Sequence, residues 1–263
     1  MSAGPGWRRF PAEPAVLDWV GSVRDAALAT ARDPAHAHWH RHGQTWFAGV
    51  NVLANDALGR VSDGPALSGA AVAHINAALG GALPFDRAQV SICQPGYPRR
   101  DAGASEAAHR FRRQRDAAHV DGLKPEGPAR RRVPAEFHAY ILGLPLTRAA
   151  PGASPLVVYQ GSHRIMADAL APLLRGRDPA HWPAVDVTAA YHAARRECFE
   201  TCPRVALPAS PGEALLLHRL CLHGVAPWAD GAASDPAGRA IAYFRPALAA
   251  VTDWPEIGRV TLP

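Results

Sequence analysis

The sequence lacks several features that would place it in a common class of proteins. No apolar run approaches the roughly 18 residues that a membrane-spanning helix needs, and the stretch from Met1 to Arg9 has no apolar core of a signal peptide. Four cysteines in 263 residues are too few and too scattered for a disulfide framework or a zinc site. We therefore expect a soluble, cytoplasmic protein with reduced thiols and no membrane segment.

Lysine is nearly absent too, because Lys124 is the single lysine among 28 basic residues. The net charge of +5 therefore comes from arginine, and arginines cluster at residues 99–100, 110–115 and 130–132, on both sides of residue 120. Such a positive rim would attract an anionic small-molecule substrate. Aromatic residues are not interleaved with these arginines, which disfavours nucleic acid as a partner, although a nucleic-acid-directed enzyme stays an alternative.

What the sequence does contain is enough apolar material for one large core. Hydrophobic residues make up 48% of the chain, and a barrel or sandwich of this length is commonly one domain. We expect a single domain over residues 1–263, with a helical N-terminal part over about 1–87 and a β core over about 88–248. Apolar residues at helical spacing predict helices over 14–32, 67–79 and 162–174.

Short apolar segments bounded by turn residues predict the strands of the core. They cover residues 46–53, 88–93, 137–146, 155–160, 214–218 and 239–246. Residues 101–116, 124–134 and 177–203 show no clear apolar periodicity, so we expect loops there, the first of them over the mouth of the site.

His119 and Asp121 form the motif around which the chain can be organised. Side chains two residues apart point to the same face of an extended strand, so both could bind one metal ion. His223 follows an apolar strand and could complete a 2-His-1-carboxylate set, which holds Fe(II) and leaves positions open for a cosubstrate and dioxygen. His218, inside that strand, is the alternative second histidine and reads more simply as a core residue.

A second group of histidines occupies alternate positions from His36 to His42. In a strand, these side chains could also chelate a metal. No carboxylate accompanies them, so the sequence favours an ordinary surface feature.

Five segments, taken together in order and spacing, resemble the phytanoyl-CoA dioxygenase-like family of Fe(II)/2-oxoglutarate oxygenases. The resemblance spans roughly residues 88–248, and short motifs gain specificity only from such shared context. The segments are His119-Val120-Asp121-Gly122, Gly161-Ser162-His163, the stretch from Pro211 to His218, Leu222-His223-Gly224, and Arg239-Ala240-Ile241.

This resemblance implies a mainly β fold with flanking helices, a double-stranded β-helix of the cupin-like jelly-roll type. It also implies that His119, Asp121 and His223 bind Fe(II), and that Arg239 binds the distal carboxylate of the cosubstrate 2-oxoglutarate. The interval from His223 to Arg239 is long for the family and leaves Arg245, on the same strand face, as the alternative anchor.

Two further residues on the strand after the motif, His138 and Tyr140, are expected to contact the cosubstrate. The expected activity is hydroxylation of a small molecule with dioxygen, with release of succinate and CO2. The alternative is a barrel of the same fold that binds a metal or an anion without turnover, because a fold does not fix a function.

Overall fold

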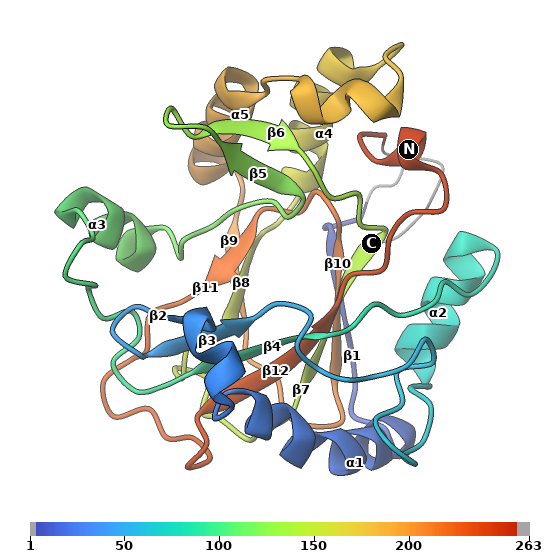
Figure 1. The fold of residues 1–263 in the computed structure, drawn as a ribbon, viewed down its shortest axis with the longest axis vertical. Coiled ribbons are helices and arrows are strands. Elements are labelled where there is room, and N and C mark those ends of the chain that lie inside the picture. The colour runs from blue at the N-terminus through green and yellow to red at the C-terminus, as the bar shows by residue number, and fades with distance from the viewer. Residues whose placement is uncertain (1–3, 257–263) are drawn as a thin grey trace.

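The computed structural model describes residues 4–256, so residues 1–3 and 257–263 of the expected domain lie outside the described residues. Ten strands form two antiparallel sheets that pack face to face (Figure 1). Helices cover the outer face of each sheet. This arrangement is the jelly roll, or double-stranded β-helix, that the sequence predicts.

The larger sheet brings together strands from both ends of the chain. Its order differs from the sequence order, because neighbouring strands come from distant segments. In spatial order it contains β1 (Trp7–Phe10), β10 (Ala214–His218), β7 (Tyr140–Pro145), β12 (Arg239–Phe244), β4 (Gln89–Cys93), β3 (Trp46–Gly49) and β2 (His40–Arg41). The N-terminal part of the chain is therefore not purely helical, since it supplies three of these strands.

The smaller sheet contains β11 (His223–Val225), β8 (Leu156–Tyr159) and β9 (Arg204–Leu207). A separate hairpin is formed by β5 (Leu123–Glu126) and β6 (Arg131–Pro134). The sequence did not predict β1, β9 or this hairpin. Their residues include exposed arginines, lysine and prolines, which hide the alternation expected of a strand.

Alternation along the strands divides the larger sheet into two faces. In register, Leu217 lies opposite Ile141, and Ser91 lies opposite Ile241, so these residues share the inner face. The inner face packs on the smaller sheet through a cluster that holds Ile141, Leu156, Val158, Leu215, Leu217 and Ile241. The space between the sheets is where a jelly roll holds its ligands.

The outer face of the larger sheet is covered by α1 (Pro14–Thr30) and α2 (Ala70–Leu79), both predicted from apolar spacing. Trp19 of α1 packs against Phe244 of β12 with ring centroids 5.8 Å apart. Gly80 ends α2 in the left-handed conformation that favours glycine. These helices close the main core and leave the inner face to the site.

Two helices lie where the sequence predicted irregular chain. The segment 101–116 contains α3 (Glu106–Gln114), which is capped by the Ser105 hydroxyl, and 177–203 contains α5 (Thr188–Thr201). Neither has a continuous apolar stripe: α3 buries no residue fully, and α5 buries only three. Helix α5 packs with α4 (Ser162–Leu174) on the outer side of the smaller sheet. Within residues 4–256, no helix is long and apolar enough to cross a bilayer.

His218 is a core residue in the structure, together with His163 of α4. Their rings lie 4.9 Å apart, and the two residues are only 2% and 1% exposed. Burial lowers the pKa of His163 to about 4, and it holds the pKa of His218 well below its usual range. The nearby Arg164 and Arg219 act in the same direction. Both imidazoles are therefore neutral in the folded protein at neutral pH.

We predict that this pair makes the folded protein less stable in acid. Below a pH of about 6.5 both histidines bind a proton in the unfolded chain but not in the folded chain. The free energy of unfolding therefore falls between about pH 6.5 and pH 4, by about 1.4 kcal/mol per pH unit for each histidine. Urea unfolding at pH 7 and pH 5 measures this difference. His163→Leu should reduce the difference, whereas His181→Leu on the surface should leave it unchanged; equal slopes in both variants would contradict the prediction.

Candidate metal centre

The structure brings His119, Asp121 and His223 together at the edge of the smaller sheet. His223 begins β11, and His119 forms an isolated antiparallel bridge with it. The two residues exchange backbone hydrogen bonds of 2.8 and 3.0 Å. Val120, between the two residues of the motif, packs into the cluster beneath the sheet. His119 and Asp121 thus share one side of the chain, as the i and i+2 spacing predicts.

The three side chains direct their ligand atoms to one point. One ligand atom from each residue lies within 4.8 Å of the other two. Asp121 Oδ1 is 3.3 Å from His119 Nε2 and 3.9 Å from His223 Nε2. Among the described residues, this is the single group of three or more metal-ligating side chains that is so arranged.

The second nitrogen of each imidazole is fixed by the backbone. His119 Nδ1 lies 3.1 Å from the carbonyl oxygen of Ala117, and His223 Nδ1 lies 2.9 Å from that of Cys221. A carbonyl only accepts, so each Nδ1 carries a hydrogen and each Nε2 is turned toward Asp121, where it can ligate a metal ion once it carries no proton. This arrangement is the one by which proteins orient histidine ligands of metals.

The charges at the site suit a divalent cation. Burial would raise the pKa of Asp121, but the hydrogen bond with His119 and the charges of His223 and Arg245 hold it well below its usual range. Burial lowers the pKa of His223. Burial acts in the same direction on His119, but the hydrogen bond with Asp121 outweighs it and raises the pKa of His119. An ionised carboxylate and two imidazoles whose Nε2 atoms face it fit Fe(II), which would displace the proton that His119 shares with Asp121.

Arg245 holds the second carboxylate oxygen of Asp121. Its Nη1 lies 3.4 Å from Asp121 Oδ2, and both side chains are largely buried. This contact leaves Oδ1, the oxygen nearer the two imidazoles, as the ligand atom. Arg245 is therefore paired with Asp121, which is itself one of the three candidate metal ligands.

Two glycines permit the close packing around the ligands. Gly122 has φ +87°, and a Cβ there would lie 2.2 Å from the carbonyl oxygen of Glu136. A Cβ on Gly224 would lie 2.1 Å from the carbonyl oxygen of Asp116. Larger residues would therefore displace the chain beside Asp121 or beside His223.

A buried ion pair fixes the loop that carries His119. Asp116 is 1% exposed and adopts the left-handed conformation, with φ +56°. Its carboxylate accepts bonds of 2.8 and 2.6 Å from the guanidinium of Arg204 on β9, and one of 3.1 Å from the Tyr159 hydroxyl on β8. Its carbonyl oxygen accepts from the backbone of Val225, two residues after His223. Asp116 thus ties the His119 loop to the whole smaller sheet.

We predict that Arg204→Ala weakens both stability and Fe(II) binding. The change leaves the buried Asp116 carboxylate without its cation; because the Arg204 side chain is 44% exposed, we expect a loss of about 1–3 kcal/mol, below that for a fully buried pair. Chemical unfolding and Fe(II) titration measure the two effects. Arg175→Ala, which breaks a surface pair with Glu256, is the control and should change neither by more than a small amount. Identical behaviour of the two variants would exclude a role for the network.

A cavity of about 70 Å³ opens in front of the three ligands, between the two sheets. Its polar residues come from the inner face of β3, β4 and β12, and Ile141 and Leu156 make its apolar wall. Four cavity residues were not predicted from the sequence: Trp46, Gln89, Ser91 and Tyr243. The signal was present, since Gln89 and Ser91 are polar residues at alternate positions of an otherwise apolar strand.

Arg239 lies on the same inner face, at the start of β12. It is 6% exposed, no ion pair involves it within residues 4–256, and its Nη1 has no hydrogen-bond partner there. The Tyr243 hydroxyl and the Cys93 thiol contact the Arg239 side chain, and the fully buried Ser154 hydroxyl contacts Cys93. The charge of Arg239 opposes the effect of burial, which raises the pKa of Tyr243. A buried cation without a counter-ion is costly unless an anion joins it.

The structure places the remaining predicted site residues elsewhere. Tyr140 lies in the cluster on the outer face of the larger sheet, on the opposite side from Ile141. His138 Nδ1 bonds to the carbonyl oxygen of Arg245 at 2.9 Å, and its Nε2 lies 3.4 Å from Glu136. Neither residue lines the cavity in front of the ligands. The run from His36 to His42 belongs to no three-residue ligand group in the described part of the chain.

The chain has low similarity to known proteins: no family model matches it, and no curated protein matches it. Solved structures with a similar fold include AviO1 from Streptomyces viridochromogenes Tue57, which is 15% identical with a TM-score of 0.45 over 94% of this chain and 92% of that one. EctD from S. alaskensis, solved with 2-oxoglutarate and 5-hydroxyectoine, is 17% identical with a TM-score of 0.45 over 92% of this chain and 72% of that one. At these values the likeness carries no functional argument.

Proposed function

We propose that this protein is an Fe(II)/2-oxoglutarate-dependent oxygenase, related to the phytanoyl-CoA dioxygenase-like family, that hydroxylates a small molecule. The observation that carries the proposal is a shared space between the two sheets. Two imidazoles and an ionised carboxylate converge at the cavity there, and Arg239, which has no ion pair within residues 4–256, is buried on the same face of β12 as the cavity residue Tyr243, just outside the cavity lining. A metal ion would satisfy the two imidazoles and the carboxylate, and a dianion bound to that metal would satisfy the arginine.

In this proposal His119, Asp121 and His223 hold Fe(II), and Arg239 pairs with the distal carboxylate of 2-oxoglutarate. Bound iron, 2-oxoglutarate and dioxygen supply the oxidation of an unactivated C–H bond, with succinate and CO2 as by-products. Arginine suits the distal carboxylate because its planar fork pairs with both oxygens. The hydroxyls of Ser154 and Tyr243, which belong to the same buried cluster as Arg239 and Cys93, are donors that can complete the carboxylate's hydrogen bonds.

The cavity walls serve the same reaction. Ile141, Leu156 and Val225 present apolar surface toward the ligands and exclude water. Gln89, Ser91 and Trp46 supply the polar groups that can orient a substrate, and the Trp46 indole already donates to the Ser91 hydroxyl at 3.0 Å. Residue 121 is a carboxylate that can occupy a metal position which a halide would need. We therefore expect hydroxylation, not halogenation.

Succinate release tests this function without a known substrate. Protein loaded anaerobically with Fe(II) and 2-oxoglutarate and then exposed to air should form succinate slowly, and a true substrate from a library of small acids, amines and thioesters should accelerate it. Stoichiometric Fe(II) binding with no succinate under any condition would instead favour a non-catalytic binding protein. Steeply salt-dependent binding of DNA or RNA would point to a nucleic-acid substrate.

A further inference from the structure

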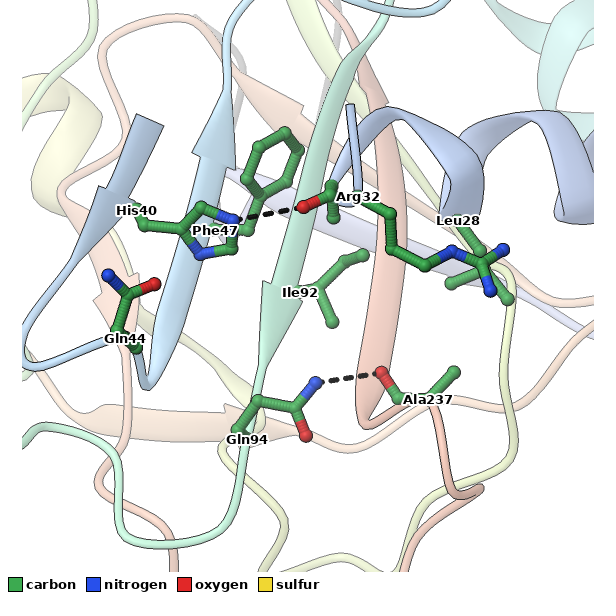
Figure 2. Close-up of a pocket in the computed structure, with 9 residues that line it drawn as sticks. Leu28, Arg32, His40, Gln44, Phe47, Ile92, Gln94 and Ala237 are labelled. Atoms are coloured by element: carbon green, nitrogen blue, oxygen red, sulfur yellow. Dashed lines mark hydrogen bonds between the residues drawn. The ribbon is translucent and has the colours of Figure 1, made fainter. Parts of the chain in front are cut away.

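A second cavity, of about 290 Å³, opens on the outer side of the larger sheet. Its walls come from the end of α1, the β2–β3 hairpin and the end of β4 (Figure 2). Phe47 and Ile92 are buried and form an apolar floor. A cavity of this size and mixed lining is at the lower limit of those that bind small molecules.

This cavity is separate from the candidate metal centre, although the same strands line both. On β4, Ser91 faces the inner cavity and Ile92 faces the outer one. On β3, Trp46 faces inward and Phe47 faces outward. The sheet itself therefore separates the two cavities, and a small molecule bound in the outer cavity cannot reach the metal-binding side chains of the inner one.

His40 lines the outer cavity and carries a buried hydrogen-bond acceptor without a partner among the described residues. Its Nε2 lies 3.0 Å from the carbonyl oxygen of Ala31, so Nε2 carries the hydrogen and Nδ1 keeps a lone pair. Nδ1 is buried and has no partner among the residues that the structure describes. In Figure 2 this nitrogen is on the side of the ring turned away from Ala31, toward Gln44 and Gln94. A buried acceptor without a donor costs stability until a ligand supplies one.

Arg32 and Gln44 bring unused polar groups to the rim. Within residues 4–256, no ion pair or side-chain hydrogen bond involves either residue, and both are exposed. Gln44 lies in the left-handed conformation, with φ +68°, in a turn where His42 and Gly43 are left-handed as well. Such local strain is found more often at binding sites than elsewhere. The side-chain NH2 of Gln94 donates a hydrogen bond to the carbonyl oxygen of Ala237. The side-chain carbonyl oxygen of Gln94 stays available to a ligand.

From these groups we infer that the outer cavity is a second ligand site, which takes a small carboxylic acid with an apolar body and a hydroxyl group. The carboxylate pairs with the Arg32 guanidinium, the hydroxyl donates to His40 Nδ1, and the apolar body rests on Phe47 and Ile92. This inference does not depend on the function proposed for the metal centre.

Binding of 3-phenyllactate and 2-hydroxy-4-methylpentanoate, measured by ligand-observed NMR and calorimetry, tests the site. At least one of them should bind saturably, and 3-phenylpropionate, which lacks the hydroxyl, should bind more weakly than 3-phenyllactate. Arg32→Met should weaken binding by about two- to fivefold, as expected for loss of an exposed ion pair. Arg130→Met, which removes the same charge from the β5–β6 loop, is the matched control and should have no effect.

A hydroxy acid could also bind at the metal centre, so Asp121→Ala separates the two sites. The outer site predicts unchanged binding in Asp121→Ala and weaker binding in Arg32→Met. The reverse pattern would place the acid at the metal centre and overturn this inference while leaving the proposed oxygenase function intact. Absence of saturable binding by both acids, or equal binding by Arg32→Met and Arg130→Met, would overturn it as well.

Discussion

Asp121→Ala should abolish stoichiometric Fe(II) binding and, with it, succinate formation. The substitution removes the charged ligand atom between the two imidazoles and leaves Arg245 as a buried cation in its place. Loss of an outer partner of a metal ligand already costs about 10- to 100-fold in affinity, so loss of a ligand should exceed that range. Anaerobic Fe(II) titration followed by metal analysis measures the effect.

Two controls make this result specific. Asp168→Ala removes an exposed carboxylate from α4 and should bind Fe(II) as the unchanged protein does. His218→Gln tests the alternative histidine, which lies in the core beside His163 and should affect stability without affecting metal stoichiometry. Full Fe(II) binding by Asp121→Ala, or loss of it in His218→Gln with the fold intact, would refute the assignment of the ligands.

Arg239→Ala should raise the KM for 2-oxoglutarate about a hundredfold or more while leaving Fe(II) affinity nearly unchanged. The expected size follows from loss of a buried bidentate pair, at about 1.4 kcal/mol for each factor of ten. Arg239→Lys should recover only part of the loss, because an ammonium group cannot reproduce the planar fork. Initial rates of succinate formation over a range of 2-oxoglutarate concentrations measure the effect.

Arg245→Ala distinguishes the two arginines by a different outcome. Arg245 contacts Asp121 Oδ2, so its loss should weaken Fe(II) binding first and change the KM for 2-oxoglutarate only at limiting metal. If Arg245→Ala raised that KM at saturating Fe(II), and Arg239→Ala did not, the anchor would be Arg245. If neither substitution changed it, the assignment of 2-oxoglutarate as cosubstrate would fail.

The sequence predicted the parts of this protein in which local pattern and tertiary packing agree. The strands around residues 90, 142, 157, 216 and 241 are short apolar segments between turns, and they supply four strands of the larger sheet and the central strand of the smaller one. The i and i+2 spacing of His119 and Asp121 likewise predicted their shared side of the chain. The sequence could not show which side of each strand faces inward. For that reason Tyr140 was expected at the site, whereas it lies on the outer face of the larger sheet.

Other features depend on contacts between distant residues and leave little local signal. Asp116 resembles any polar loop residue, yet it is buried because Arg204 on β9 and Tyr159 on β8, both distant in the sequence, contact its carboxylate. Helix α5 buries few residues, so its apolar stripe is thin, and α4 and the smaller sheet stabilise it. In both cases tertiary packing outweighs local propensity.

The bridge between His119 and His223 has a consequence for the order of events during biosynthesis. These backbone partners lie far apart in the chain, and closing such a long loop is slow and comes late in folding. A nascent chain that exposes only His119 and Asp121 offers two ligands and no rigid frame, and it should capture iron poorly. Under the proposed function, metal loading would wait until translation has passed β11, and a loaded protein would be harder to unfold, since a ligand that prefers the native state stabilises it.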